Sequence, residues 1–342
     1  MEFASMASPP ILPLHDAFAA FGRLLPAARR IVLTTHVNPD GDGLGSELAL
    51  ANHFHATGRE AWIVNYSPTP AQYRFLDPDG TRLLLYDPPR HNPLLRDADL
   101  IIVVDTNHPD RLVSMKEAVL SSPAAKVVID HHLEPDTFAA LYVIDDTTCA
   151  TGEIIFRLLE SLGAAHVTPA SATALYTAIM TDTGSFRYPK TDADVHRIVA
   201  QLIECGADPS AIFQQVYEQG PAGRLQLLGE VLAGMHIAHG GRVCALQVTQ
   251  EMLQRTGTTI ADTDAFVPYA LSIGGVQIGL MFSEVDGAIK VNFRSKGDIR
   301  INELAKLFGG NGHMNAAGAS VANRRLKDVV TEVLARASEF VR

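Results

Sequence analysis

The sequence predicts an α/β fold in two parts, an N-terminal domain built on a parallel sheet and a smaller α+β C-terminal domain, with the active-site cleft between them. The chain has 342 residues, which favours about two domains. In the first half, short aliphatic runs alternate with helical patterns, as is typical of a parallel sheet with helices on both faces. Beyond residue 223 apolar residues alternate with period two, which is typical of paired antiparallel strands.

Four short apolar runs predict the buried strands of the parallel sheet, at 31–35, 62–65, 100–105 and 126–130. Helices are predicted to begin near Leu44 and after Arg111. Three more are expected, at 151–162, from Pro169 to about Thr181 with Thr168 as the N-cap, and at 194–205. The first half therefore has the strand and helix alternation that a parallel sheet requires.

The second half begins after a stretch rich in Gly and Pro, and the predicted boundaries are 1–218 for the first domain, 219–224 for a linker and 225–342 for the second domain. The alternating runs 276–282 and 289–293 flank Asp286-Gly287, a strong hairpin signal. An apolar stripe from 326 to 337 predicts a final amphipathic helix. Residues 1–13 are expected to lie outside the folded domain, the first five as an expression-derived or start-site extension.

Composition excludes several classes of protein. The net charge of −10 leaves no broad basic surface that could grip a long nucleic acid, and no apolar run is long enough to span a bilayer. Three widely spaced cysteines form neither a disulfide framework nor a CxxC zinc motif. The N-terminus has no Lys or Arg before Arg23, which excludes a signal peptide. We therefore expect a cytoplasmic protein.

Acidic and imidazole side chains follow the ends of several predicted elements. Ligands of open α/β sheets bind outside the carboxyl ends of the strands, so these side chains should meet at one edge. Uncompensated carboxylates would repel one another there, and two divalent ions would balance them. Mixed carboxylate and imidazole ligands suit Mn²⁺, with Mg²⁺, Fe²⁺ or Co²⁺ as substitutes, and paired ions are a device for displacement at phosphorus. The side chains are His36, Asp40, Asp42, Asp105, Asp130, His131, His132 and Asp182.

Two other motif interpretations fit poorly. Gly41, Gly43 and Ser46 approach a dinucleotide-binding fingerprint, but the third glycine is missing and Asp40 and Asp42 would confront the pyrophosphate. An EF-hand loop fails because Leu44 stands where its third acidic ligand should be. The acidic motif is thus better explained by catalytic metal ions.

A smaller constellation lies in the second half. Arg294, Ser295 and Lys296 follow a predicted strand, and a glycine-rich segment from Gly309 to Gly312 leads into His313. Glycine N–H groups can cradle phosphate, and Arg294 with His313 would supply a phosphate clamp that the acidic first half lacks.

The ordered set of motifs resembles the DHH-family phosphoesterases with their associated C-terminal domain, over nearly the whole chain. Size and domain content resemble the NrnA-type oligoribonucleases, which also remove the 3′-phosphate from adenosine 3′,5′-bisphosphate (pAp). The resemblance rests on His36-x-Asn38-Pro39-Asp40-Gly41-Asp42 with Gly45-Ser46, on Asp105, on Asp130-His131-His132, on Asp182-Thr183-Gly184 with Phe186, and on the glycine-rich segment before His313.

The resemblance implies a role for each matching residue. His36, Asp40 and Asp105 would hold one metal ion, and Asp42, Asp105, His131 and Asp182 the other, with Asp105 bridging. His132 would face the scissile phosphate, and Asp130 would orient a histidine. Substrate phosphate or the terminal nucleotide would be bound by Arg294, Ser295, Gly310, Gly312 and His313. Asn311 interrupts the glycine run that is usual in the family, which leaves the phosphate contacts of that loop open.

The implied activity is manganese-dependent hydrolysis of short oligoribonucleotides to 5′-mononucleotides, and of pAp to AMP and phosphate. One alternative is a phosphodiesterase of cyclic dinucleotides or their linear products, of the c-di-AMP or pApA type, with the same metals. An alternative of another class is a catalytically silent nucleotide-binding protein. No membrane or long-duplex partner is expected, and a homodimer is expected from the resemblance alone.

Overall fold

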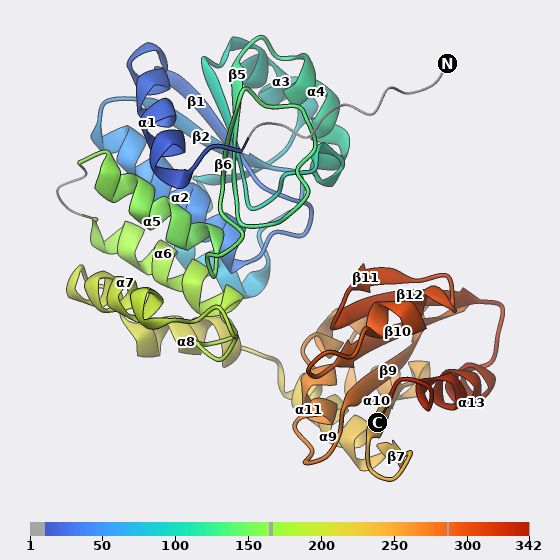
Figure 1. The fold of residues 1–342 in the computed structure, drawn as a ribbon. Coiled ribbons are helices and arrows are strands. Elements are labelled where there is room, and N and C mark those ends of the chain that lie inside the picture. Colours follow the sequence, from blue (N-terminus) through green and yellow to red (C-terminus); the bar gives the residue numbers. More distant parts are fainter. Residues whose placement is uncertain (1–10, 164–166, 286, 342) are drawn as a thin grey trace. The chain divides into compact units, whose positions relative to one another are not determined.

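The computed structural model describes residues 11–163, 167–285 and 287–341, which form two compact units that meet in the chain at Gln219 and Gly220 (Figure 1). The helix α9 (Ala222–Ala233) already begins inside the expected linker range, directly after Pro221. Within the described ranges, every helix is too short or too polar to cross a membrane.

The first unit is built on a six-stranded sheet in the order β3-β2-β1-β4-β5-β6, and all neighbouring strands are parallel. This confirms the predicted parallel sheet. The edge strands β3 and β6 were not predicted, because three or four residues are too few for a periodic signal. The strands are β1 (Arg30–Thr34), β2 (Glu60–Asn65), β3 (Leu83–Leu85), β4 (Leu100–Val104), β5 (Ala125–Asp130) and β6 (Leu141–Ile144).

Helices cover both faces of this sheet (Figure 1). Alternate strand residues point to opposite faces and both sets are buried, which explains why the strands read as continuous apolar runs. One face packs against α1 (Leu14–Leu24), α2 (Gly41–Ala56) and α5 (Thr151–Ser161), and the other against α3 (Pro88–Asp97) and α4 (Lys116–Ser121). The helix α6 (Pro169–Asp182) packs on α2 and α5. Beyond α6 lie α7 (Ala193–Glu204) and α8 (Pro209–Tyr217), and three 3₁₀ turns span Leu25–Ala27, Ala71–Leu76 and Pro109–Met115.

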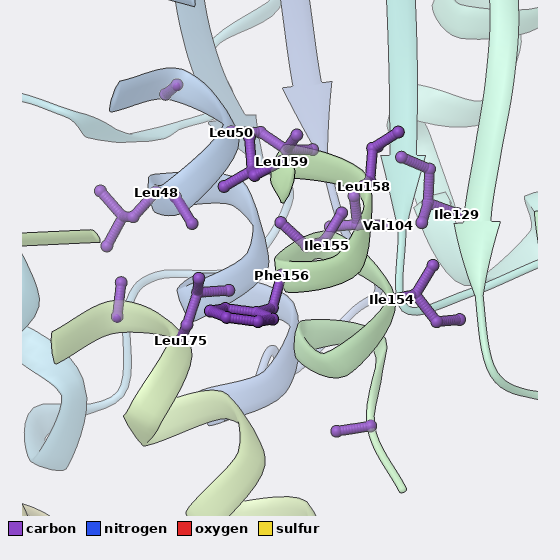
Figure 2. Close-up of a cluster of buried hydrophobic side chains, with 14 of the residues drawn as sticks. Leu48, Leu50, Val104, Ile129, Ile154, Ile155, Phe156, Leu158, Leu159 and Leu175 are labelled. Atoms are coloured by element: carbon purple, nitrogen blue, oxygen red, sulfur yellow. The ribbon is translucent and has the colours of Figure 1, made fainter. Parts of the chain in front are cut away.

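The core on the α2 side holds the helices that carry the candidate site. Figure 2 shows Ile154, Ile155 and Leu158 of α5 in one cluster of apolar side chains, which also includes Leu48 of α2 and the sheet residue Val104. These side chains are fully or almost fully buried. The start of α5 is thereby held in a fixed place beside α2 and the sheet.

The second unit contains a mixed sheet in the order β11-β12-β10-β9-β8-β7. All neighbours are antiparallel except β8 and β9, whose long helical connection permits parallel pairing. The predicted α+β class is confirmed, and the expected hairpin joins β9 to β10, although Asp286 lies outside the described residues. The strands are β7 (His236–Ala238), β8 (Val243–Val248), β9 (Ile278–Val285), β10 (Ala288–Ser295), β11 (Asn311–His313) and β12 (Ala316–Ala322).

Two groups of helices cover this second sheet. On one face lie α12 (Ile301–Lys306) and α13 (Leu326–Ala337), and α13 occupies the stripe predicted from the sequence. The other core cluster is formed with α9, α10 (Gln250–Thr256) and α11 (Val267–Leu271), and a 3₁₀ turn spans Ile260–Thr263. The second unit therefore has its own apolar core on each face.

Candidate metal centre

The candidate site lies at the carboxyl ends of β1, β4 and β5. The strand order reverses between β1 and β4, which is the topological switch point where open α/β sheets bind ligands. Three overlapping groups of ligand atoms gather there, each with its atoms within 4.8 Å of one another. The groups are Asp105, His131 and His132; His36, Asp40 and Asp105; and Asp42, His131 and Asp182.

The first histidine of the site, His36, follows β1 and is almost completely buried. Its Nδ1 lies 2.9 Å from the carbonyl oxygen of Val37, which places the proton on Nδ1 and leaves the Nε2 lone pair toward the acids. The Nε2 atom lies 3.2 Å from Asp105 Oδ2 and 3.9 Å from Asp40 Oδ1. Burial lowers the pKa of His36, so its ring is a neutral ligand at pH 7.

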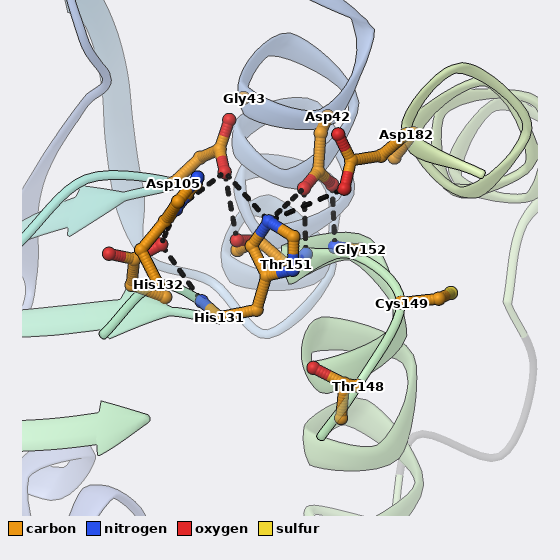
Figure 3. A network of polar contacts seen from close by, with 12 residues as sticks. Asp42, Gly43, Asp105, His131, His132, Thr148, Cys149, Thr151, Gly152 and Asp182 are labelled. Atoms are coloured by element: carbon orange, nitrogen blue, oxygen red, sulfur yellow. Dashed lines mark hydrogen bonds and ion pairs between the residues drawn. The ribbon is translucent and has the colours of Figure 1, made fainter. Parts of the chain in front are cut away.

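The second histidine, His131, follows β5 and faces three carboxylates (Figure 3). Its Nε2 lies 3.4 Å from Asp182 Oδ2, 3.8 Å from Asp105 Oδ1 and 3.9 Å from Asp42 Oδ2. Burial, together with the neighbouring His132, lowers the pKa of His131 to about 4. This ring is therefore also neutral at pH 7 and can offer a lone pair.

Local sequence explains how the first acids are held. Asp40 is the N-cap of α2, where its Oδ1 accepts hydrogen bonds from the N–H groups of Asp42 at 3.0 Å and Gly43 at 3.3 Å. A Cβ at Gly43 would lie 2.5 Å from Thr35 Oγ1, so only glycine lets α2 begin this close to the end of β1. Asp105 has a positive φ of 57°, a left-handed conformation that Asp adopts more readily than most residues.

Electrostatics make this cluster unfavourable without a cation. Burial, followed by repulsion from neighbouring acids, raises the pKa values of Asp42 and Asp105 well above the ordinary range. The same causes raise the pKa of Asp182 to about 6. His36 Nε2 and Asp105 Oδ2 lie 3.2 Å apart, a contact that a proton or a cation between the two atoms stabilises. Carboxylates and neutral imidazoles in this arrangement fit a divalent metal ion.

The third histidine, His132, is oriented by a buried acid. Asp130 Oδ1 lies 2.8 Å from His132 Nδ1 and also accepts a 2.8 Å hydrogen bond from the N–H of His131. The side-chain amide of Asn107 donates to the carbonyl oxygen of His132 at 2.9 Å. Because Nδ1 is engaged with Asp130, Nε2 is the ring nitrogen of His132 that can contact a substrate.

Thr151, Gly152 and Asn107, which form hydrogen bonds to these ligands or to the backbone beside them, were not predicted from the sequence. Thr151 and Gly152 of α5 donate to Asp42, and Thr151 also donates to Asp105. Asn107 fixes the backbone after β5. A threonine at a predicted helix start indicates a cap, and nothing in the sequence showed that this helix points at the acids.

The residues expected to bind substrate lie in the second unit. Ala316 of β12 pairs with Arg294 of β10 on one side and with His313 of β11 on the other. Arg294 and His313 are therefore in register across these three strands. The side chain of His313 is outside the described residues. Ser295 Oγ donates to the carbonyl oxygen of Ile299 at 2.7 Å and accepts from Asn315 at 2.9 Å, so it already has two partners.

The glycine-rich segment is packed tightly rather than loose. A Cβ at Gly310 would lie 2.3 Å from the carbonyl oxygen of Gly318, and one at Gly312 would lie 2.4 Å from that of Ala316. Asn311, which breaks the glycine run, accepts a hydrogen bond from the N–H of Gly312. Close packing of β11 on β12 therefore explains Gly310 and Gly312, and their contact with phosphate stays a prediction.

Comparison with known proteins agrees with the motifs. The sequence matches the DHH family N-terminal domain over residues 30–179 and the DHHA1 domain over residues 240–342. It is 31% identical over 316 residues to the bifunctional oligoribonuclease and PAP phosphatase NrnA of Thermus thermophilus, covering 90% of this chain and 91% of that protein. The chain belongs to the DHH family. The membership expected from the motifs is thereby confirmed.

Other DHH-family relatives extend this result. The bifunctional oligoribonuclease and PAP phosphatase NrnA of Bacillus subtilis is 28% identical over 88% of this chain and 94% of its own length. The crystal structure of an exopolyphosphatase-related protein from Bacteroides fragilis superimposes with a TM-score of 0.90 at 29% identity, covering 95% of this chain and 97% of that one. Both units of this chain therefore have counterparts in its relatives.

Proposed function

We propose that this DHH-family chain is a phosphoesterase that uses two divalent ions, Mn²⁺ by preference, to hydrolyse short oligoribonucleotides and pAp. The observation that carries the proposal is the cluster of neutral imidazoles and repelling carboxylates at the switch point of the sheet. The oligoribonuclease and PAP phosphatase relatives, similar over about nine-tenths of the chain, supply the substrate class. The net charge of −10 favours short substrates over long strands.

Each ligand has a proposed place. His36, Asp40 and Asp105 would hold one ion, and Asp42, Asp105, His131 and Asp182 the other. Bound ions would supply an activated water and neutralise the charge that builds up on the phosphoryl oxygens. Asp105 is the natural bridge because its Oδ2 lies nearest His36 and its Oδ1 nearest His131.

The chain's own groups would do the remaining work. Water adds to phosphorus, the bond from phosphorus to the ribose oxygen breaks, and that oxygen takes a proton. His132 Nε2 would donate this proton or stabilise the phosphoryl charge, with Asp130 holding the ring at Nδ1. Arg294, Ser295, Gly310, Gly312 and His313 would bind the substrate phosphate or the terminal nucleotide. The homodimer and the cytoplasmic location stay predictions from the sequence.

The test is a substrate panel with added Mn²⁺: pAp, a ribodinucleotide, a long single strand, a cyclic dinucleotide and pyrophosphate. We expect AMP and phosphate from pAp, 5′-mononucleotides from the dinucleotide, and slow turnover of the long strand. His131→Asn should abolish these reactions, while His53→Asn, at the far end of α2, should leave them intact. Turnover of the cyclic dinucleotide alone would favour the alternative phosphodiesterase. Tight nucleotide binding without any turnover would show a silent binding protein.

A further inference from the structure

Thr151, the first residue of α5, contacts two of the candidate ligands at once. Its backbone N–H donates to Asp42 Oδ2 at 2.7 Å, and its hydroxyl donates to Asp105 Oδ1 at 3.1 Å (Figure 3). The next residue, Gly152, donates its N–H to the other oxygen of Asp42 at 2.8 Å. Thr151 is completely buried, so water does not compete for these bonds.

These bonds determine how the two acids present their oxygens. Both oxygens of Asp42 receive an N–H from the first turn of α5, where the helix dipole also favours a negative charge. A carboxylate oxygen has two lone-pair sites, so each oxygen keeps one for a cation. The Thr151 hydroxyl has a single proton, and giving it to Asp105 Oδ1 limits rotation of that carboxylate.

The place of α5 is itself tightly constrained. A Cβ at Gly152 would lie 2.6 Å from the Cβ of Ala178 on α6 and 3.3 Å from Asp42 Oδ1. The helix start therefore cannot shift without disturbing α6, the helix that ends in Asp182. The first turn of α5 thus donates hydrogen bonds both to Asp105, which follows β4, and to Asp42, at the start of α2.

We propose that Thr151 is a positioning residue of the metal centre, whose hydroxyl and N–H hold Asp105 and Asp42 in the orientation that binds both ions. This inference rests on the proposed function. It assigns Thr151 no contact with substrate. Partners of metal ligands commonly change metal affinity by about 10- to 100-fold when they are lost.

The test compares Thr151→Val, which keeps the shape and the backbone N–H but loses the hydroxyl, with Thr151→Ser, which keeps the hydroxyl. Thr177→Val is the matched control, because Thr177 is equally buried and its hydroxyl donates only to a carbonyl of its own helix. Mn²⁺ affinity of the full chain is measured without substrate, from the electron paramagnetic resonance signal of free Mn²⁺. Melting temperature with EDTA reports folding.

We expect Thr151→Val to raise the Mn²⁺ dissociation constant by about tenfold or more, with Thr151→Ser and Thr177→Val close to wild type. A folded Thr151→Val with wild-type affinity would overturn the inference. If that variant fails to fold, Thr151→Ala carries the same test with less side-chain volume. If the wild-type protein hydrolyses the panel but Thr151→Val binds Mn²⁺ with wild-type affinity, this inference is rejected and the proposed function stands. If the wild-type protein neither binds Mn²⁺ nor turns over any substrate, the proposed function is rejected as well.

Discussion

The Nε2 atom of His36 lies 3.2 Å from Asp105 Oδ2, although 69 residues separate the two in sequence. The contact exists because β1 and β4 are parallel neighbours with Thr34 paired to Val103, so the residues that follow the two strands emerge at the same edge. The second oxygen of Asp105 lies 3.8 Å from His131, at the end of β5. One carboxylate thus faces histidines from two other strands.

Replacing this shared carboxylate should separate catalysis from stability. We expect Asp105→Asn to lower the rate of pAp hydrolysis with Mn²⁺ by at least about a hundredfold. Losing a residue that only holds a metal ligand in place already lowers metal affinity or activity by about 10- to 100-fold, and Asp105 is itself a proposed ligand. In EDTA at about pH 7.5 the same variant should melt at a higher temperature than wild type, because repulsion among buried acids is relieved. Near-normal activity would contradict the bridging role, and a lower melting temperature would contradict the account of charge repulsion.

A glycine on α2 sets the distance between two helices of the site. A Cβ at Gly45 would lie 2.2 Å from the carbonyl oxygen of Ala174 on α6. Gly45→Ala should therefore destabilise the first unit by about 1–3 kcal/mol and weaken Mn²⁺ binding, because α2 carries Asp42 and α6 carries Asp182. Urea unfolding followed by far-ultraviolet circular dichroism measures the first effect.

The matched control is Gly229→Ala on α9, where an added Cβ would meet no atom of the described residues within 4 Å apart from its chain neighbours and its own helix backbone. Alanine has the higher helix propensity, so this variant should be as stable as wild type or more stable by up to about 1 kcal/mol. If Gly45→Ala were as stable as wild type, like this control, the close approach of α2 to α6 would not explain the glycine at position 45.

Much of the candidate site could be anticipated because it follows from strand ends. Asp105 and His131 come directly after buried apolar runs, and parallel strands deliver such residues to one edge without any knowledge of packing. Asp182 was harder to place because it ends a helix. A Cβ at Gly41 would lie 2.5 Å from Thr181 Oγ1, so the end of α6 reaches the start of α2 only because that position is glycine.

Other features depend on contacts that leave no local pattern. Thr151 lies 109 residues from Asp42 in sequence, and its N–H looks like that of any residue at a helix start. The parallel pair β8 and β9 was missed because period-two alternation indicates a strand without its direction. The strand β6 is too short to have a signal of its own and is recognised only beside β5.

Removal of the Arg294 guanidinium should affect substrate and not metal. We expect Arg294→Ala to raise KM for pAp by about 10- to 100-fold, the value of one lost charged hydrogen bond, with Mn²⁺ affinity unchanged. Arg325→Ala, at an exposed arginine paired with Asp328, is the control and should leave KM unchanged. Loss of Mn²⁺ in Arg294→Ala, measured by elemental analysis, would refute the division of roles between the two units.

The fully buried Glu47 on α2 should make stability depend on pH. Its Oε2 accepts a 2.8 Å hydrogen bond from Asn65, and for Oε1 no partner is found among the described residues. Burial raises the pKa of Glu47 from 4.5 to about 8. The folded chain thus holds this proton more tightly than the unfolded chain, so the associated stability is complete below pH 4.5, falls as pH rises, and is lost above about pH 8.

Glu47→Gln removes this dependence while Asn65 keeps an acceptor. The unfolding free energy of the variant relative to wild type should therefore rise with pH by about 1.4 kcal/mol per unit inside the window, measured in urea with EDTA. Glu117→Gln, at an exposed glutamate, should show no such rise, and a difference independent of pH in Glu47→Gln would show that burial does not hold Glu47 protonated.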